Sequence, residues 1–136
     1  MSKRSYREVR KLETFLERFR YLALRGNVGQ ATFGFDRWVN QGFYTSREWK
    51  QARDAIIVRD EGCDLGLDGY EIHDRIYIHH INPITLGQLE AGDPCLLDPD
   101  NLITVTHRTH NAIHYGDERL LPRPLVERKP GDTKLW

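Results

Sequence analysis

The chain has 136 residues, with 20 Lys+Arg against 20 Asp+Glu and a formal net charge of zero. With 39% hydrophobic and 29% charged residues, its composition is that of one folded domain and excludes a disordered chain. No stretch reaches the roughly 18 to 20 apolar residues of a membrane span, and two cysteines, Cys63 and Cys95, cannot build a disulfide framework. Since no apolar signal segment follows Met1, we expect a cytoplasmic protein without a membrane partner.

The first 45 residues predict a basic helical extension. Apolar residues recur every three or four positions from Tyr6 to Ala23, which predicts one amphipathic helix with a basic outer face. We expect the basic side chains of this face to contact a DNA backbone, with a merely solvated face as the alternative. They are Arg4, Arg7, Arg10, Lys11 and Arg18. The aromatic and glycine-containing stretch 27–45 predicts an irregular segment held by ring packing.

A helix and a pair of strands are predicted next. Thr45 or Ser46 caps a helix that runs to about Asp60. Residues 69–72 and 76–81 predict two short strands that are joined by a turn, and the second of them ends in a pair of histidines.

A long, turn-rich connection over residues 82–100 follows, with room for one helical turn at 86–90. Residues 102–105 predict another strand. Thr106 then caps a helix that Gly116 ends.

The zero net charge hides a strong asymmetry along the chain. Residues 1–59 hold 13 basic and six acidic residues, whereas residues 60–136 hold seven basic and 14 acidic ones, so the two parts carry +7 and −7. A basic part suits a polyanion, and a part rich in His and Asp suits a divalent cation. All six histidines lie in the acidic part: His73, His79, His80, His107, His110 and His114.

Four of these histidines have the spacing of a metal site. His110 and His114 lie four residues apart on a predicted helix, so both imidazoles project from one face and suit a single metal ion. The predicted strand that ends in His79 and His80 is the best source of a third ligand. Because adjacent strand residues point to opposite sides, one histidine of the pair can face the metal while the other faces a substrate.

These residues, together with Asn101, resemble the motif of the HNH nuclease family, in the version with a double His and a His-x-x-x-His helix. The wider chain resembles the small HNH proteins of phages and prophages. The resemblance implies an α+β fold with a ββα-metal (His-Me finger) core and an N-terminal helical extension. We therefore expect a basic extension at 1–45, the HNH core at 46–116 and an extended tail at 117–136, all in one compact domain.

The resemblance also implies a role for each residue of the motif. His80 is expected to be the general base that takes a proton from the attacking water, and Asn101 to hold the other ring nitrogen of His80 through its side-chain carbonyl. His79, His110 and His114 are expected to bind one divalent ion, which could be Mg, Mn, Ni or Zn.

Two arginines flank the motif and leave an alternative open. Arg75 and Arg108 are placed to hold the scissile phosphate, or they form ordinary salt bridges with Asp74 or Glu71.

Many HNH proteins carry two CxxC pairs that bind a structural zinc, and this chain departs from that pattern. The first slot, at 63–66, has Cys63 alone, and the second falls at Thr106 and Thr109. A structural zinc is therefore not expected. Apolar packing is expected to hold the core instead, through Trp49, Ile56, Leu65, Leu102 and Ile113.

The implied activity is that of a metal-dependent HNH endonuclease that hydrolyses phosphodiester bonds in DNA, in phage DNA processing or packaging, with DNA and other phage proteins as partners. One alternative is a non-catalytic DNA-binding or phage-assembly module that keeps the metal-stabilised scaffold. Another is a small regulator that reads DNA with its basic helix and uses the metal only to stabilise its fold.

Overall fold

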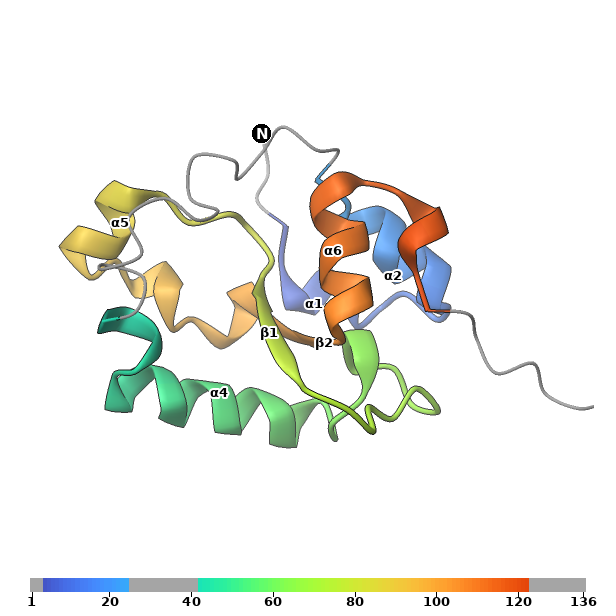
Figure 1. Ribbon diagram of the computed structural model, residues 1–136, viewed down its shortest axis with the longest axis horizontal. Helices are drawn as coiled ribbons and strands as arrows, with labels where there is room; N and C mark the ends of the chain where they lie inside the picture. Colours follow the sequence, from blue (N-terminus) through green and yellow to red (C-terminus); the bar gives the residue numbers. More distant parts are fainter. Residues whose placement is uncertain (1–3, 25–41, 123–136) are drawn as a thin grey trace, which may run out of the picture.

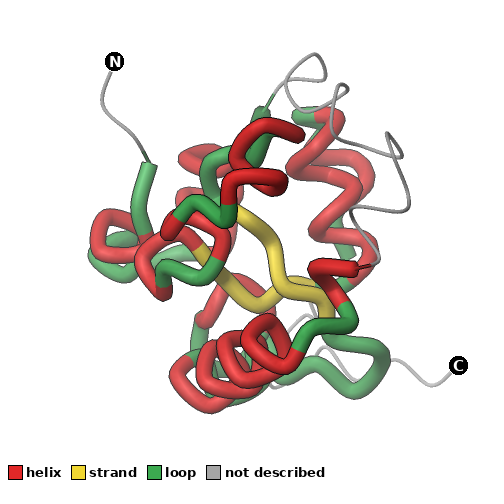
Figure 2. Tube along the Cα trace, turned by 90° about the vertical axis from the view of Figure 1, so that its left-hand side faces the viewer, coloured by secondary structure: helices red, strands yellow, loops and turns green. Residues whose placement is uncertain are grey.

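A two-stranded antiparallel sheet lies in the middle of the molecule, with helices around it (Figures 1 and 2). The computed structural model describes residues 4–24 and 42–122. The strands are β1 (Tyr77–His80) and β2 (Leu102–Val105), and the mixture of helices with this small sheet makes the fold α+β, as predicted. The α-helices are α1 (Tyr6–Val9), α2 (Phe15–Leu22), α4 (Arg47–Arg59), α5 (Leu86–Ala91) and α6 (His107–Tyr115). The single 3-10 turns are η1 (Asp64–Gly66), η2 (Pro94–Leu96), η3 (Pro99–Asn101) and η4 (Glu118–Leu120).

The alternation of side chains along β2 determines which helices cover each face of the sheet. Ile103 and Val105 pack with residues of α2 and α6, whereas Leu102 packs with Trp49 and Ile56 of α4. Successive strand residues point to opposite faces, so α4 lies on one side of the sheet and α6 on the other (Figure 1). The register pairs Tyr77 with Val105 and His80 with Leu102.

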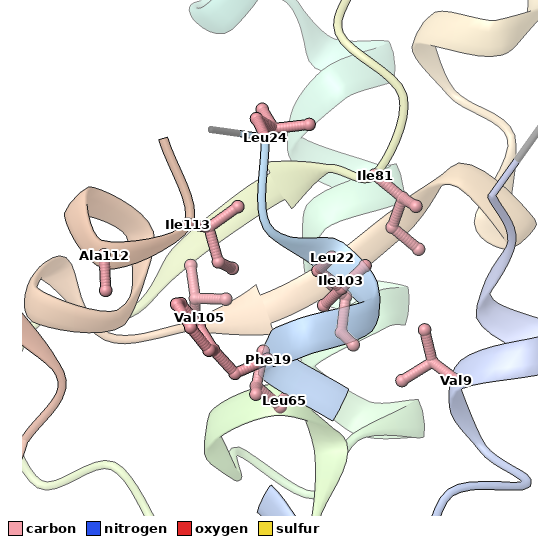
Figure 3. Packing of buried hydrophobic residues seen from close by; sticks show 10 residues of the cluster. All are labelled: Val9, Phe19, Leu22, Leu24, Leu65, Ile81, Ile103, Val105, Ala112 and Ile113. Atoms are coloured by element: carbon pink, nitrogen blue, oxygen red, sulfur yellow. The ribbon is translucent and has the colours of Figure 1, made fainter. Parts of the chain in front are cut away.

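The larger hydrophobic cluster joins the N-terminal helices to the sheet and to α6. Phe19 and Leu22 of α2 point toward Ile103 and Val105 of β2, and Ile113 of α6 completes the contact (Figure 3). Each of these side chains is at most 1% exposed. The residues predicted to form the core are buried as expected, although they divide between two clusters: Leu65 and Ile113 in the larger, and Trp49, Ile56 and Leu102 in the smaller.

Local capping signals correctly predicted the start of α4 and both ends of α6. The hydroxyls of Ser46 and Thr106 accept hydrogen bonds from backbone amides in the first turns of α4 and α6. Gly116 ends α6 with a φ of 64°, a left-handed conformation that glycine adopts without strain. Thr85 begins α5, which confirms the helical turn expected in the long connection.

The single helix predicted from Tyr6 to Ala23 is wrong, because the structure contains two helices, α1 and α2, in its place. Thr14 accepts a hydrogen bond from the amide of Glu17 and so starts a new helix where the apolar periodicity continued. The guanidinium of Arg18 donates to the carbonyls of Leu12 and Arg10 at the break between the helices. The apolar stripe is therefore real, but it is carried by two short helices.

The predicted strand at 69–72 is also wrong. Instead of a hairpin with residues 76–81, this segment turns back on η1, where Glu71 forms an isolated bridge with Cys63 and the carbonyl of Tyr70 accepts from the amide of Asp64. The second predicted strand exists as β1, but its partner is β2.

The C-terminal segment begins with a turn and not with extended chain. Asp117 accepts from the amide of Arg119 and starts η4, which corrects the first residues of the tail predicted at 117–136. Residues 123–136 lie outside the described part, as do residues 25–41 of the predicted irregular segment. Among the described residues, the helices are too short and too polar to cross a lipid bilayer.

Candidate metal centre

Three histidines from two elements meet between β1 and α6. His79 projects from β1 toward α6, and its ring centroid lies 5.2 Å from that of His110 and 5.4 Å from that of His114. The Nε2 atoms of His110 and His114 are 2.9 Å apart, as expected for residues one helical turn apart with converging rings. One ring nitrogen from each histidine lies within 4.8 Å of the others. These three residues could therefore hold one metal ion, as predicted.

Burial keeps these histidines in the form that binds metals. Desolvation first, and then the neighbouring His110 and His114, hold the pKa of His79 well below its ordinary value of 6.5. The same causes, desolvation and then His114, lower the pKa of His110 to about 3, and desolvation lowers the pKa of His114. All three imidazoles are therefore neutral at physiological pH, and a neutral imidazole is the metal ligand.

One atom of the cluster is left without a hydrogen bond. The Nε2 atom of His79 is fully buried and has no hydrogen-bond partner in the described part of the chain. A buried polar atom of this kind costs about 1–3 kcal/mol when nothing satisfies it. A cation held by the three imidazoles would satisfy this lone pair, so the residues fit a metal ion. Their all-nitrogen donor set suits Zn²⁺, Ni²⁺ or Mn²⁺ better than Mg²⁺.

His80, the next residue on β1, points to the other face of the sheet. Its ring stacks on the indole of Trp49 with centroids 5.5 Å apart, and its Nε2 atom lies 3.0 Å from the carbonyl oxygen of Leu96. A carbonyl can only accept, so Nε2 carries the proton and Nδ1 keeps a free lone pair. Burial lowers the pKa of His80, which keeps the ring neutral and able to accept a proton.

The predicted hydrogen bond from His80 to Asn101 is wrong. The side-chain carbonyl of Asn101 accepts from the backbone and side-chain amides of Asn82, and its NH₂ group donates to the carbonyl of Cys95. Because Cys95 precedes Leu96, Asn101 holds the segment whose carbonyl contacts His80. Asn101 therefore acts on His80 through the backbone of η2 and not through direct contact.

Asn82 and the carbonyl of Leu96 were not recognised as parts of the site. Asn82 also donates to the carbonyl of Arg4 and accepts from its amide, so it joins the N-terminal segment to Asn101. A backbone carbonyl leaves no signal in residue type. An Asn directly after a histidine pair and before Pro83 is a weak signal, since Asn-Pro also marks ordinary turns.

The basic residues expected near a substrate divide into two groups. Arg4, Arg7, Arg10 and Lys11 line one groove of the surface. Arg18, in contrast, is only 7% exposed and donates to backbone carbonyls, including that of Leu65, so the prediction that it contacts DNA is wrong. Its place in the periodic pattern did not show that its guanidinium is buried and donates to backbone carbonyls.

Arg75 and Arg108 are exposed, and neither forms an ion pair with Asp74, Glu71 or another side chain that the structure describes. The salt-bridge alternative is not observed, and the phosphate contact stays a prediction. His107 lies outside the metal cluster, and its Nε2 atom is 3.2 Å from the side-chain nitrogen of Asn111.

A buried carboxylate, that of Asp64, connects η1 to α6 by hydrogen bonds. Asp64 accepts hydrogen bonds from the hydroxyls of Thr106 and Thr109 and from the amide of Thr106. This network fastens η1 to the first turn of α6, and two of its members, Thr106 and Thr109, stand at the positions of the second cysteine slot.

No family model, curated protein or solved structure matches this chain. Its geometry defines a small α+β protein with three histidines that could hold a metal ion.

Proposed function

We propose that this protein is a metal-dependent HNH endonuclease that hydrolyses phosphodiester bonds in DNA, with a ββα-metal core formed by β1, β2 and α6. The observation that carries the proposal is the cluster of His79, His110 and His114 directly beside a histidine, His80, whose tautomer is fixed. A purely structural metal site needs no such neighbour. The resemblance to phage-encoded proteins supports a role in phage DNA processing or packaging.

His80 is the general base in this proposal. The carbonyl of Leu96 holds the proton on Nε2, so Nδ1 takes a proton from a water molecule as the water oxygen attacks phosphorus and the bond to the 3′ oxygen breaks. Stacking on Trp49 fixes the plane of the ring. Asn101 and Asn82 keep the Leu96 segment in place. The metal held by His79, His110 and His114 would supply charge neutralisation at the phosphate and at the leaving oxygen.

The activity is tested by incubating supercoiled plasmid with the protein and Mg²⁺, Mn²⁺, Ni²⁺ or Zn²⁺, and by following nicked and linear DNA on a gel. We expect cleavage by the wild type and a loss of about 100-fold or more in His80→Ala, because general-base catalysis contributes about that much. His73→Ala is the matched control, since His73 is exposed and lies before β1.

Two outcomes would contradict the proposal in different ways. If the wild type leaves the plasmid intact with every ion, the endonuclease assignment is wrong and the non-catalytic module is favoured. If His80→Ala cuts as fast as His73→Ala while circular dichroism shows both variants folded, His80 is not the base.

Metal binding is measured separately by calorimetric titration of the metal-free protein with Zn²⁺ and Ni²⁺. His110→Ala removes one of three ligands and should weaken binding by at least about tenfold. His107→Ala, on the same helix but outside the cluster, should bind as the wild type does. Equal affinities of the two variants would remove His110 from the site.

A further inference from the structure

A groove of about 850 Å³ runs between α1 and the segment that connects the two strands. One wall carries the basic side chains of the N-terminal segment and α1, which are Arg4, Arg7, Arg10 and Lys11. The other wall includes the amide side chains of Asn82, Gln88 and Asn101. A groove lined by cations and polar amides suits a phosphate backbone, because phosphate oxygens accept from both kinds of group.

Three carboxylates also line the groove, and two of them already face its cations. Asp100 pairs with Arg7 at 3.5 Å, and Glu8 pairs with Lys11 at 3.4 Å. The side chains of Arg7 and Lys11 are 80% and 69% exposed, so these are surface ion pairs that stabilise the fold little and exchange easily. Arg10 forms no ion pair with any residue that the structure describes. Each of these cations is therefore accessible to a phosphate.

The amide wall of the groove is connected to His80 by hydrogen bonds. Asn82 contacts Asn101, and Asn101 donates to the carbonyl of Cys95, which is the residue before Leu96. The carbonyl of Leu96 contacts His80. A DNA strand bound in the groove would therefore lie against the Cys95–Leu96 segment, which orients His80.

We propose that this groove holds the phosphate backbone of the DNA substrate beside the bond that is cut. The inference rests on the proposed function and deepens it, since it assigns the substrate a path over α1 and the 82–101 segment. Arg7 and Arg10 bind phosphates directly, and Arg4 does so with the part of its guanidinium that does not donate to Tyr21.

Binding is measured without cleavage, by fluorescence anisotropy of a labelled DNA duplex in EDTA at several salt concentrations. The variant Arg7→Ala/Arg10→Ala removes two groove cations, both exposed. Arg47→Ala/Lys50→Ala is the matched control, because it removes two exposed cations of α4 that do not line the groove. We expect the groove variant to bind at least about tenfold more weakly, with a salt slope smaller by about two, and the control to bind like the wild type.

The proposal is overturned if both variants bind alike, or if the wild type binds no DNA in EDTA. Neither result depends on hydrolysis, so the groove proposal and the endonuclease proposal are tested independently. Loss of binding in the groove variant supports the groove even if no metal supports cleavage. If the groove variant binds DNA like the wild type and still cleaves plasmid, the endonuclease assignment is supported and the groove is rejected as the DNA-binding site.

Discussion

Arg18 is a charged residue that lies in the core and joins three segments of the chain. Its guanidinium donates to the carbonyls of Leu12, Leu65 and Arg10, at 2.8, 2.8 and 3.4 Å. These carbonyls belong to the break between α1 and α2 and to η1. Leu65 has a φ of 55°, in the left-handed region, so its carbonyl points in a different direction from that of a residue in a right-handed helical turn. The arginine thus satisfies backbone groups that no helix or strand can satisfy.

We therefore expect Arg18→Met to lower the free energy of unfolding by about 1–3 kcal/mol, since the buried carbonyl of Leu65 loses its donor while the aliphatic volume is kept. Arg20→Met is the control, because Arg20 is exposed on the same helix and pairs with Glu118. Urea denaturation measures both variants, and an equal loss in the two would show that Arg18 is no more important than a surface residue.

At the residue scale, the sequence predicted which side chains cluster together but not the hydrogen-bond partners of each. The spacing of His110 and His114 predicted that both lie on one face of a helix, and the resemblance to the HNH motif singled out His79 as the third member of the cluster. The contacts of Arg18, and those of Asn101 with the amide of Asn82 and the carbonyl of Cys95, could not be predicted, because they are made with backbone atoms. Those atoms are the same in every residue and carry no sequence signal.

At the scale of elements, the hydrogen bonds of Asp64 fasten two pieces of the fold to each other. Its carboxylate is buried, and desolvation raises its pKa although hydrogen bonds from Thr109 and Thr106 oppose that shift. The network joins η1 to α6, the helix that carries two of the three candidate ligands. The position of those ligands therefore depends on Asp64.

Thr109→Val removes the buried hydroxyl that donates to Asp64 and keeps the shape of the side chain. We expect a loss of about 1–3 kcal/mol in the free energy of unfolding, measured by chemical denaturation. In an Asp64→Ala background the same change should have a clearly smaller effect, because the partner is already gone. Additive losses would show that the contact contributes little.

Elements with strong local signals were predicted well, whereas the pairing between elements was not. The caps at Ser46, Thr106 and Gly116 gave the ends of α4 and α6. The partner of β1 is separated from it by a long connection, and residues 69–72 have the composition of a strand although they fold back on Cys63. Which segments pair depends on tertiary packing, and periodicity does not encode it.

For the whole molecule, buried neutral histidines make stability depend on pH. The folded-state pKa values of His79, His80 and His110 lie below 6.5, and that of His110 is about 3. Below about pH 6.5 the unfolded chain binds protons that the folded protein does not bind. The stability that these groups contribute is therefore present above that pH and is lost as the pH falls toward the folded-state values.

In the metal-free protein we expect the free energy of unfolding to fall between pH 6.5 and 5, by about 1.4 kcal/mol per pH unit for each histidine that stays neutral only when folded. Denaturation in EDTA at several pH values measures this slope. His110→Ala should reduce this slope by about 1.4 kcal/mol per pH unit, which corresponds to one proton, and His73→Ala should leave the slope unchanged. A flat profile for the wild type would contradict the burial of the cluster.

The contact between Asn82 and Asn101 closes the base of the connection between the two strands. The segment that follows Pro83 and contains α5 lies outside this contact, and its exposed end at Gly92 is far in sequence from both strands. Lengthening a loop whose ends are already fixed costs little, about 0.6 kcal/mol for each doubling. The number of residues between Pro83 and Cys95 is thus not set by the site, whereas Cys95 and Leu96 must keep their place relative to Asn101 because their carbonyls contact Asn101 and His80. A chain with a longer or shorter segment around α5 could therefore keep the same histidines in register, so relatives are expected to share residues 79–82 and 95–101 and to differ in the number of residues between them.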